Sequence, residues 1–186
     1  MAGPELSSYL KAQDFEAFRR LVRHYNHDMA NRISRITTEC SILARIADKV
    51  APEEALTDLS RAGEIKELAA QAKTLVDNLG NVREFFYPGG DTEGNGLKKY
   101  APYDASGWDT MTGEFTAYLI DRLGPIEPLF QHLEALEASG VIKADGRAKP
   151  ILTARASMSK SVGEMEDLLT AEEWDKLLPE WLGRPE

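Results

Sequence analysis

Cysteine is almost absent from this sequence of 186 residues, in which Cys40 is the single example. One cysteine can build neither a disulfide framework nor a cysteine-based zinc site, and such usage fits a reducing cytosol. The sequence also lacks an apolar run of the roughly 20 residues that a membrane helix needs. Its N-terminus has neither the basic region nor the apolar region of a signal peptide. We therefore expect a cytoplasmic protein that does not act at a membrane.

An excess of positive charge is missing as well. The formal net charge is −9 at pH 7, which argues against nucleic acid as the main partner because no net-basic surface offsets the phosphate charge. Internal repeats and low-complexity tracts are also absent. Hydrophobic residues make up 42% of the chain, which is enough to form a core.

A long helical pattern dominates the first half. From Phe15 to Val50 the apolar residues recur every three or four positions, which is the spacing of one face of a helix. Pro52 starts a second apolar pattern, which runs to about position 86 and stops at Tyr87-Pro88-Gly89-Gly90. We expect an antiparallel helical hairpin within a domain over 1–88. Such a hairpin needs a second layer, from another copy of the chain or from the C-terminal half.

The sequence after position 88 contains only shorter helical patterns. Residues 89–107 hold five glycines and no periodicity, which predicts a linker or loop. A mostly helical C-terminal domain is expected over 108–186, with helices near 110–123, 125–139 and 151–169 and a turn or short strand near 140–146. Thr170 is the expected cap of a last helix, and Trp181 is expected to dock that end of the chain.

The first helix carries a histidine cluster on its outer face. With Phe15 at heptad position a, His27 falls at position f, Asp28 at g, and His24 and Asn31 at c. We therefore predict an exposed stripe at three- and four-residue steps: Arg20, Arg23, His24, His27 and Asn31. Five arginines lie between positions 15 and 35, so this basic segment of an acidic protein suits an acidic or phosphorylated partner.

This combination of side chains suits phosphoryl transfer. A neutral imidazole nitrogen is a good nucleophile toward phosphorus. A carboxylate beside it can accept the proton of the other ring nitrogen and fix the tautomer. His27 has Asp28 next to it and the Asn31 amide four positions on, whereas His24 has neither in that arrangement.

The stretch Arg23-His24-x-x-His27-Asp28-x-x-Asn31-Arg32 resembles the motif of histidine kinase dimerisation and phosphotransfer domains. It is most similar to that of the sporulation-type histidine phosphotransferases and related citrate-sensing kinases. The resemblance covers roughly residues 15–87. It implies His27 as phosphoacceptor, Asp28 as its base, Asn31 as a helper, and a dimeric four-helix bundle made of two hairpins.

The resemblance also implies a partner, a response-regulator receiver domain that supplies the aspartyl phosphate and holds the Mg²⁺. No cofactor and no metal are expected on this chain. Arg20, Arg23, His24 and Arg35 are the predicted partner-binding residues. The C-terminal half lacks the Asp-x-Gly-x-Gly motif of a kinase ATPase domain, so it is expected to be an unrelated helical domain or a degenerate α/β remnant. We predict a phosphorelay phosphotransferase without kinase activity.

Other functions fit the sequence less closely. The main alternative is a non-catalytic dimeric helical adaptor or regulator that uses the same bundle for docking. Metal-dependent phosphohydrolases need a histidine well upstream of a His-Asp pair, and no histidine precedes His24. A metal site from His24, His27 and Asp28 lacks a fourth strong ligand, and His132 is interpreted as structural.

Overall fold

The computed structural model describes residues 1–91, 93–143 and 146–184. These residues are mostly helical and form no strand, which confirms the mainly α prediction. Their β pairing is an isolated antiparallel bridge between Leu56 and Ile142. The turn or strand expected near 140–146 is thus represented by this bridge, while 144 and 145 lie outside the described residues.

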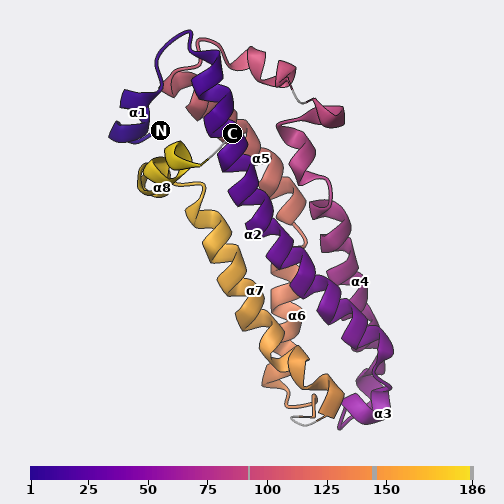
Figure 1. The fold of residues 1–186 in the computed structure, drawn as a ribbon. Coiled ribbons are helices and arrows are strands. Elements are labelled where there is room, and N and C mark those ends of the chain that lie inside the picture. The colour runs from indigo at the N-terminus through magenta and orange to yellow at the C-terminus, as the bar shows by residue number, and fades with distance from the viewer. Residues whose placement is uncertain (92, 144–145, 185–186) are drawn as a thin grey trace. The chain divides into compact units, whose positions relative to one another are not determined.

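Eight α-helices are assigned in the described residues (Figure 1): α1 Pro4–Tyr9, α2 Phe15–Lys49, α3 Pro52–Ala55, α4 Ala62–Leu79, α5 Ala105–Leu123, α6 Ile126–Ala138, α7 Lys149–Asp167 and α8 Ala171–Gly183. Short 3-10 turns connect them: η1 Leu59–Arg61, η2 Val82–Phe85, η3 Pro88–Gly90, η4 Asn95–Tyr100 and η5 Gly146–Ala148.

Helix α2 has the length that its periodicity predicts. Its N-terminus is capped by Asp14, whose carboxylate accepts a hydrogen bond from the Ala17 amide at 3.0 Å. The second helix was predicted to be continuous, and this was wrong. Helix α3 ends at Ala55, Leu56 is extended, and the Asp58 side chain accepts a hydrogen bond from the Ser60 amide. An aspartate that bonds its own local backbone favours a turn over helix continuation.

The chain divides into two compact units, and each combines residues from both halves of the sequence. The first unit contains residues 1–32, 81–121 and 164–186, and the second contains residues 33–80 and 122–163. The boundaries proposed from the sequence, at 88 and 108, stay predictions.

In the second unit, four helical segments pack around one core. The segments are the 33–49 part of α2, α4, α6 and α7, and they lie side by side in Figure 1. Contacts between neighbouring segments connect them in turn: Asp48 with Lys73, Gln71 with His132, Glu134 with Arg155, and Glu39 with Ser157. The second layer that the hairpin needs is thus present within one chain, whereas the dimeric four-helix bundle stays a prediction.

The first unit is built around an aromatic cluster. The Tyr25 ring is fully buried and makes edge-on contacts with five other rings at centroid distances of 5.5–6.4 Å. Those rings belong to Phe86, Trp108, Phe115, Trp174 and Trp181. Such pairs add to the stabilisation from area burial alone. The cluster fixes the C-terminal helix α8 against α2, and this positions the candidate site.

Candidate functional site

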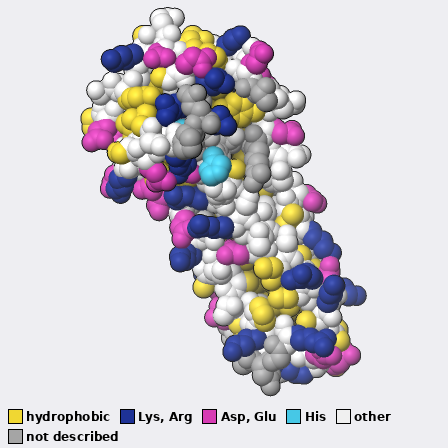
Figure 2. All heavy atoms as spheres, in the orientation of Figure 1, with side chains coloured by type: hydrophobic (Ala, Val, Ile, Leu, Met, Phe, Trp, Pro, Cys, Tyr) yellow, Lys and Arg dark blue, Asp and Glu magenta, His cyan; other side chains and the backbone are white. Residues whose placement is uncertain are grey.

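His27 lies on the exposed face of α2 in the first unit, as its heptad position predicts. Its side chain is 66% exposed, while Tyr25 and Met29 on either side of it are buried. On the face of the molecule drawn in Figure 2, Lys and Arg side chains gather near a histidine over α2. An imidazole so placed is accessible to another protein.

Asp28 and Asn31 both contact the same ring nitrogen of His27. His27 Nδ1 lies 3.2 Å from Asp28 Oδ1 and 3.3 Å from Asn31 Nδ2. The structure therefore brings together the three residues that were predicted to act together. With Nδ1 protonated, His27 donates to the Asp28 carboxylate, and the basic lone pair is then on Nε2.

Asp28 is also bound from the other side by Trp181 of α8 and by Arg184, which follows it. Trp181 Nε1 donates to Asp28 Oδ2 at 2.8 Å, and Arg184 Nη1 donates to Asp28 Oδ1 at 2.8 Å. The carboxylate is only 13% exposed. Trp181 was expected to dock, but its bond to Asp28 and the ion pair with Arg184 were not foreseen, because they join positions more than 150 residues apart in sequence.

These contacts set the ionisation of Asp28. Partial burial favours the neutral acid, but the hydrogen bonds from Arg184, Trp181 and His27 outweigh it and lower the pKa of Asp28 below its ordinary value. The carboxylate is therefore ionised at neutral pH. It is a fixed anion that orients His27 and stabilises an imidazolium, and it is a weaker base than an unpaired aspartate.

His24 and Arg20 were predicted to belong to the exposed stripe, and the structure corrects both. His24 is 7% exposed, and Arg20 Nη2 donates to the carbonyl oxygens of Leu182 and Arg184 at 3.0 and 3.2 Å. A heptad assignment allows for one packed face, but α8 and Arg184 cover a second face of α2. Arg23 is exposed, as predicted, and Arg35, which was predicted to bind the partner, is exposed as well.

The environment of His24 opposes its protonation. Burial, followed by the positive charges of Arg184, Arg20 and Arg23, lowers the pKa of His24, although Asp28 acts in the opposite direction. His24 is accordingly neutral at pH 7, like a buried histidine in a core, and its predicted role in partner binding stays a prediction.

The described residues contain no group of three or more His, Cys, Asp or Glu side chains placed to hold a metal ion. In the same residues, no helix is long and apolar enough to cross a membrane. Comparisons with family models, with curated proteins and with solved structures found no match to this chain.

Proposed function

We propose that this protein is a histidine phosphotransferase of a two-component phosphorelay, with His27 as the phosphoacceptor. The observation that carries the proposal is the exposed imidazole whose Nδ1 lies against Asp28 and Asn31. Among the described residues, no hydrogen bond involves Nε2 of His27, so that nitrogen is available to an incoming phosphoryl group. The motif that His27, Asp28 and Asn31 share with sporulation-type phosphotransferases supports the same function.

The reaction follows from this geometry. Nε2 attacks the phosphorus of an aspartyl phosphate on a receiver domain, an N–P bond forms, and the P–O bond to the receiver carboxylate breaks. The leaving carboxylate keeps the electron pair of that bond. The positive charge that develops on the ring is stabilised by Asp28 through the Nδ1–H hydrogen bond. The Mg²⁺ that neutralises the phosphoryl oxygens belongs to the receiver.

Charge complementarity supports a receiver as partner. Arg23 is exposed on α2, four residues before His27 and in the same unit. A cation beside the histidine suits an acidic surface that surrounds a phosphorylated aspartate. In this proposal Arg23 contacts the partner, whereas Arg20 and His24 support the site from within.

Phosphotransfer can be tested directly. The protein would be incubated with receiver domains phosphorylated on aspartate, and phosphate that is acid-labile and base-stable would be measured on the chain. We expect labelling of the wild type, none of His27→Gln, and wild-type labelling of His132→Gln, a histidine on α6 in the other unit. Labelling that survives His27→Gln would contradict the assignment and point to His24.

A non-catalytic adaptor is the second candidate, and one observation favours it. The Asp28 carboxylate is already engaged by Trp181 and Arg184, and this engagement weakens it as a base. An adaptor would bind receiver domains through the surface around Arg23 without accepting phosphate. Binding of receivers by the wild type and by His27→Gln with equal affinity, together with no labelling of either, would establish the adaptor.

A further inference from the structure

A groove runs along the surface of the second unit, where α2 and α4 lie side by side (Figure 1). Two cavities of about 440 and 450 Å³ form it, and they share Asp48 and Lys49 of α2. On α4 the lining residues extend from Ala62 to Asp77. At about 1.5 Å per residue this span is about 22 Å, or about four helical turns. The groove therefore has the length of a short helix.

The floor of this groove is apolar. It is formed by four buried side chains: Ala44, Ala47, Val50 and Ile65. Ile42 lies three residues before Arg45, which lines the groove, and its side chain is 41% exposed. It adds apolar surface beside the floor, because residues three apart are neighbours on a helix. Covering these side chains with another apolar surface removes them from water and favours binding.

The edges of the groove are basic, although the protein as a whole is acidic. Four cations and two anions line it: Arg45, Lys49, Lys66, Lys73, Asp48 and Asp77. Lys73 and Asp48 form an ion pair between the two helices. Within the described part of the chain, Arg45, Lys49 and Lys66 make no hydrogen bond or ion pair. With Asp77 counted against them, the groove keeps two positive charges in excess, in a chain of formal net charge −9.

We propose that this groove binds an acidic amphipathic helix of a partner protein. Apolar side chains of that helix, three and four residues apart, would pack on the floor and against Ile42. Carboxylates on its flanks would pair with Arg45, Lys49 and Lys66 at the edges. The groove belongs to the second unit and does not involve His27, so this inference is independent of the proposed phosphotransfer.

The charges favour this occupant over others. In a symmetric contact with a second copy of the chain, each copy presents the same patch, and the two basic edges would repel each other. Nucleic acid is held by contacts of several cations with its phosphates, whereas Asp48 and Asp77 lie among the cations here. A small anion would leave the apolar floor uncovered. An acidic amphipathic helix matches the floor and the edges together.

A synthetic peptide of about 15 residues tests the inference, with leucine at three- and four-residue steps and glutamate on both flanks. Fluorescence anisotropy of the labelled peptide measures its binding to the full chain. We expect saturable binding that weakens as salt is added. The same peptide with lysine in place of every glutamate should bind at least about tenfold more weakly, because its charge no longer complements the groove.

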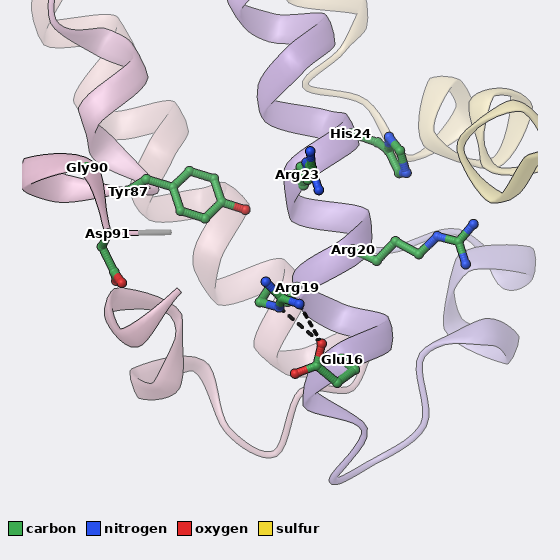
Figure 3. Close-up of a pocket in the computed structure, with 8 residues that line it drawn as sticks. All are labelled: Glu16, Arg19, Arg20, Arg23, His24, Tyr87, Gly90 and Asp91. Carbon is green, nitrogen blue, oxygen red and sulfur yellow. Dashed lines mark hydrogen bonds and ion pairs between the residues drawn. The ribbon is translucent and has the colours of Figure 1, made fainter. Parts of the chain in front are cut away.

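Substitutions at the edge locate the binding. Arg45→Gln and Lys49→Gln should each weaken the glutamate peptide by about threefold, since each removes one partly exposed ion pair. Arg23→Gln is the matched control, because Arg23 is another exposed arginine of α2 and lines a separate cavity in the first unit (Figure 3). It should bind the peptide within about twofold of the wild type. His27→Gln should do the same, which separates a failure of this inference from a failure of phosphotransfer.

Methyl NMR gives a second readout from two exposed isoleucines. Ile42 lies beside the groove, whereas Ile120, which is 64% exposed, belongs to the first unit. The glutamate peptide should shift the methyl signals of Ile42 and leave those of Ile120 in place. The comparison distinguishes docking in the groove from adhesion of leucines to any exposed apolar side chain.

Four results would overturn the inference. They are the absence of saturable binding, equal affinity for the lysine peptide, equal losses from Arg45→Gln and Arg23→Gln, and Ile42 signals that do not move at saturating peptide. Two further results would assign the groove to another occupant. Self-association of the native protein that Arg45→Gln weakens would indicate a second copy, and tighter binding of a DNA oligonucleotide that Arg45→Gln weakens would indicate nucleic acid.

Discussion

Asp28 receives hydrogen bonds on both carboxylate oxygens, and the two sources have different consequences. His27 is a neighbour in sequence, and its contact follows from the helix itself. Trp181 and Arg184 come from the far end of the chain, and they decide how acidic and how rigid the carboxylate is. The pKa of Asp28, a residue adjacent to His27 in sequence, is thus set in part by contacts with residues far away in sequence.

Replacing the carboxylate should slow the proposed phosphotransfer. In Asp28→Asn the amide can no longer stabilise the imidazolium, and we expect loading of His27 to fall by about a hundredfold or more. The time course of phosphohistidine formation measures this. Asp77→Asn, at an exposed position of α4, is the control, and equal rates for the two variants would remove Asp28 from the mechanism.

Arg184→Gln should raise the pKa of Asp28 toward its ordinary value, because the largest stabilising contact of the carboxylate is removed. A carboxyl titration followed by NMR measures the change. Since the folded-state pKa of Asp28 is depressed, the ion pair stabilises the protein above the unfolded-state pKa of about 3.9, and this stability is lost as pH falls through the folded-state value. The variant should be about 1 kcal/mol less stable at pH 6. That difference should vanish in strong acid, and one that persists there would refute this account of the ion pair.

His24 should make stability fall in mild acid. Its folded-state pKa is lowered. Below about pH 6.5, His24 therefore binds a proton in the unfolded chain but not in the folded protein. The free energy of unfolding then decreases by up to about 1.4 kcal/mol per pH unit until the folded-state pKa is reached. Urea denaturation at pH 7.5, 6.5 and 5.5 tests this, and His24→Gln should show a smaller decrease. The same decrease in both proteins would show that His24 is not the group responsible.

At the scale of elements, α2 and α8 form a pair in which one carries the candidate site and the other supports it. Helix α8 is capped by Thr170, whose hydroxyl accepts a hydrogen bond from the Glu173 amide at 3.3 Å. It is anchored by Trp174 and Trp181, which pack in the aromatic cluster. The stability of α8 therefore governs how well Asp28 is held.

Removing the cap should weaken this element. Thr170→Ala leaves an N-terminal amide of α8 without its acceptor, and we expect a loss of about 1 kcal/mol in the free energy of unfolding. Thr74→Ala, in the exposed middle of α4, should be neutral or slightly stabilising because alanine is the better helix former. Equal effects of the two changes would show that the cap contributes nothing.

At the scale of the whole molecule, helices from both halves of the chain pack together in the second unit. The apolar face of its α2 segment is therefore covered without a second copy of the chain. Cys40 lies inside this core, fully buried, with its sulfur 3.5 Å from Met158 Sδ. Burial, together with the nearby charge of Glu39, raises the pKa of the Cys40 thiol to about 12. The thiol is therefore protonated and shielded in the folded protein.

Cys40 should report on opening of the second unit. We expect no reaction with Ellman's reagent in the native protein and rapid reaction of the same protein in urea, with reactivity rising along the unfolding transition measured by circular dichroism. Rapid reaction without denaturant would contradict the burial of Cys40 in the core.

Sedimentation velocity of the native protein tests the predicted dimer.

The sequence alone determined the features that depend on local periodicity. It predicted the length of α2, the exposed position of His27 and the neighbourhood of His27, Asp28 and Asn31, because helix geometry fixes which residues lie at i+1 and i+4. It also predicted the cap at Thr170 and the burial of Trp181, since capping and large apolar side chains are local signals.

Tertiary structure alone decided the partial burial of Arg20, the burial of His24, and the engagement of Asp28 by Trp181 and Arg184. Each depends on which distant segment packs against a given face of α2. Helical periodicity identifies a face that must be buried, but it does not identify the segment that covers it or whether a second face is covered too. That segment is selected by packing among residues far apart in sequence, and here it decides how the candidate site is held.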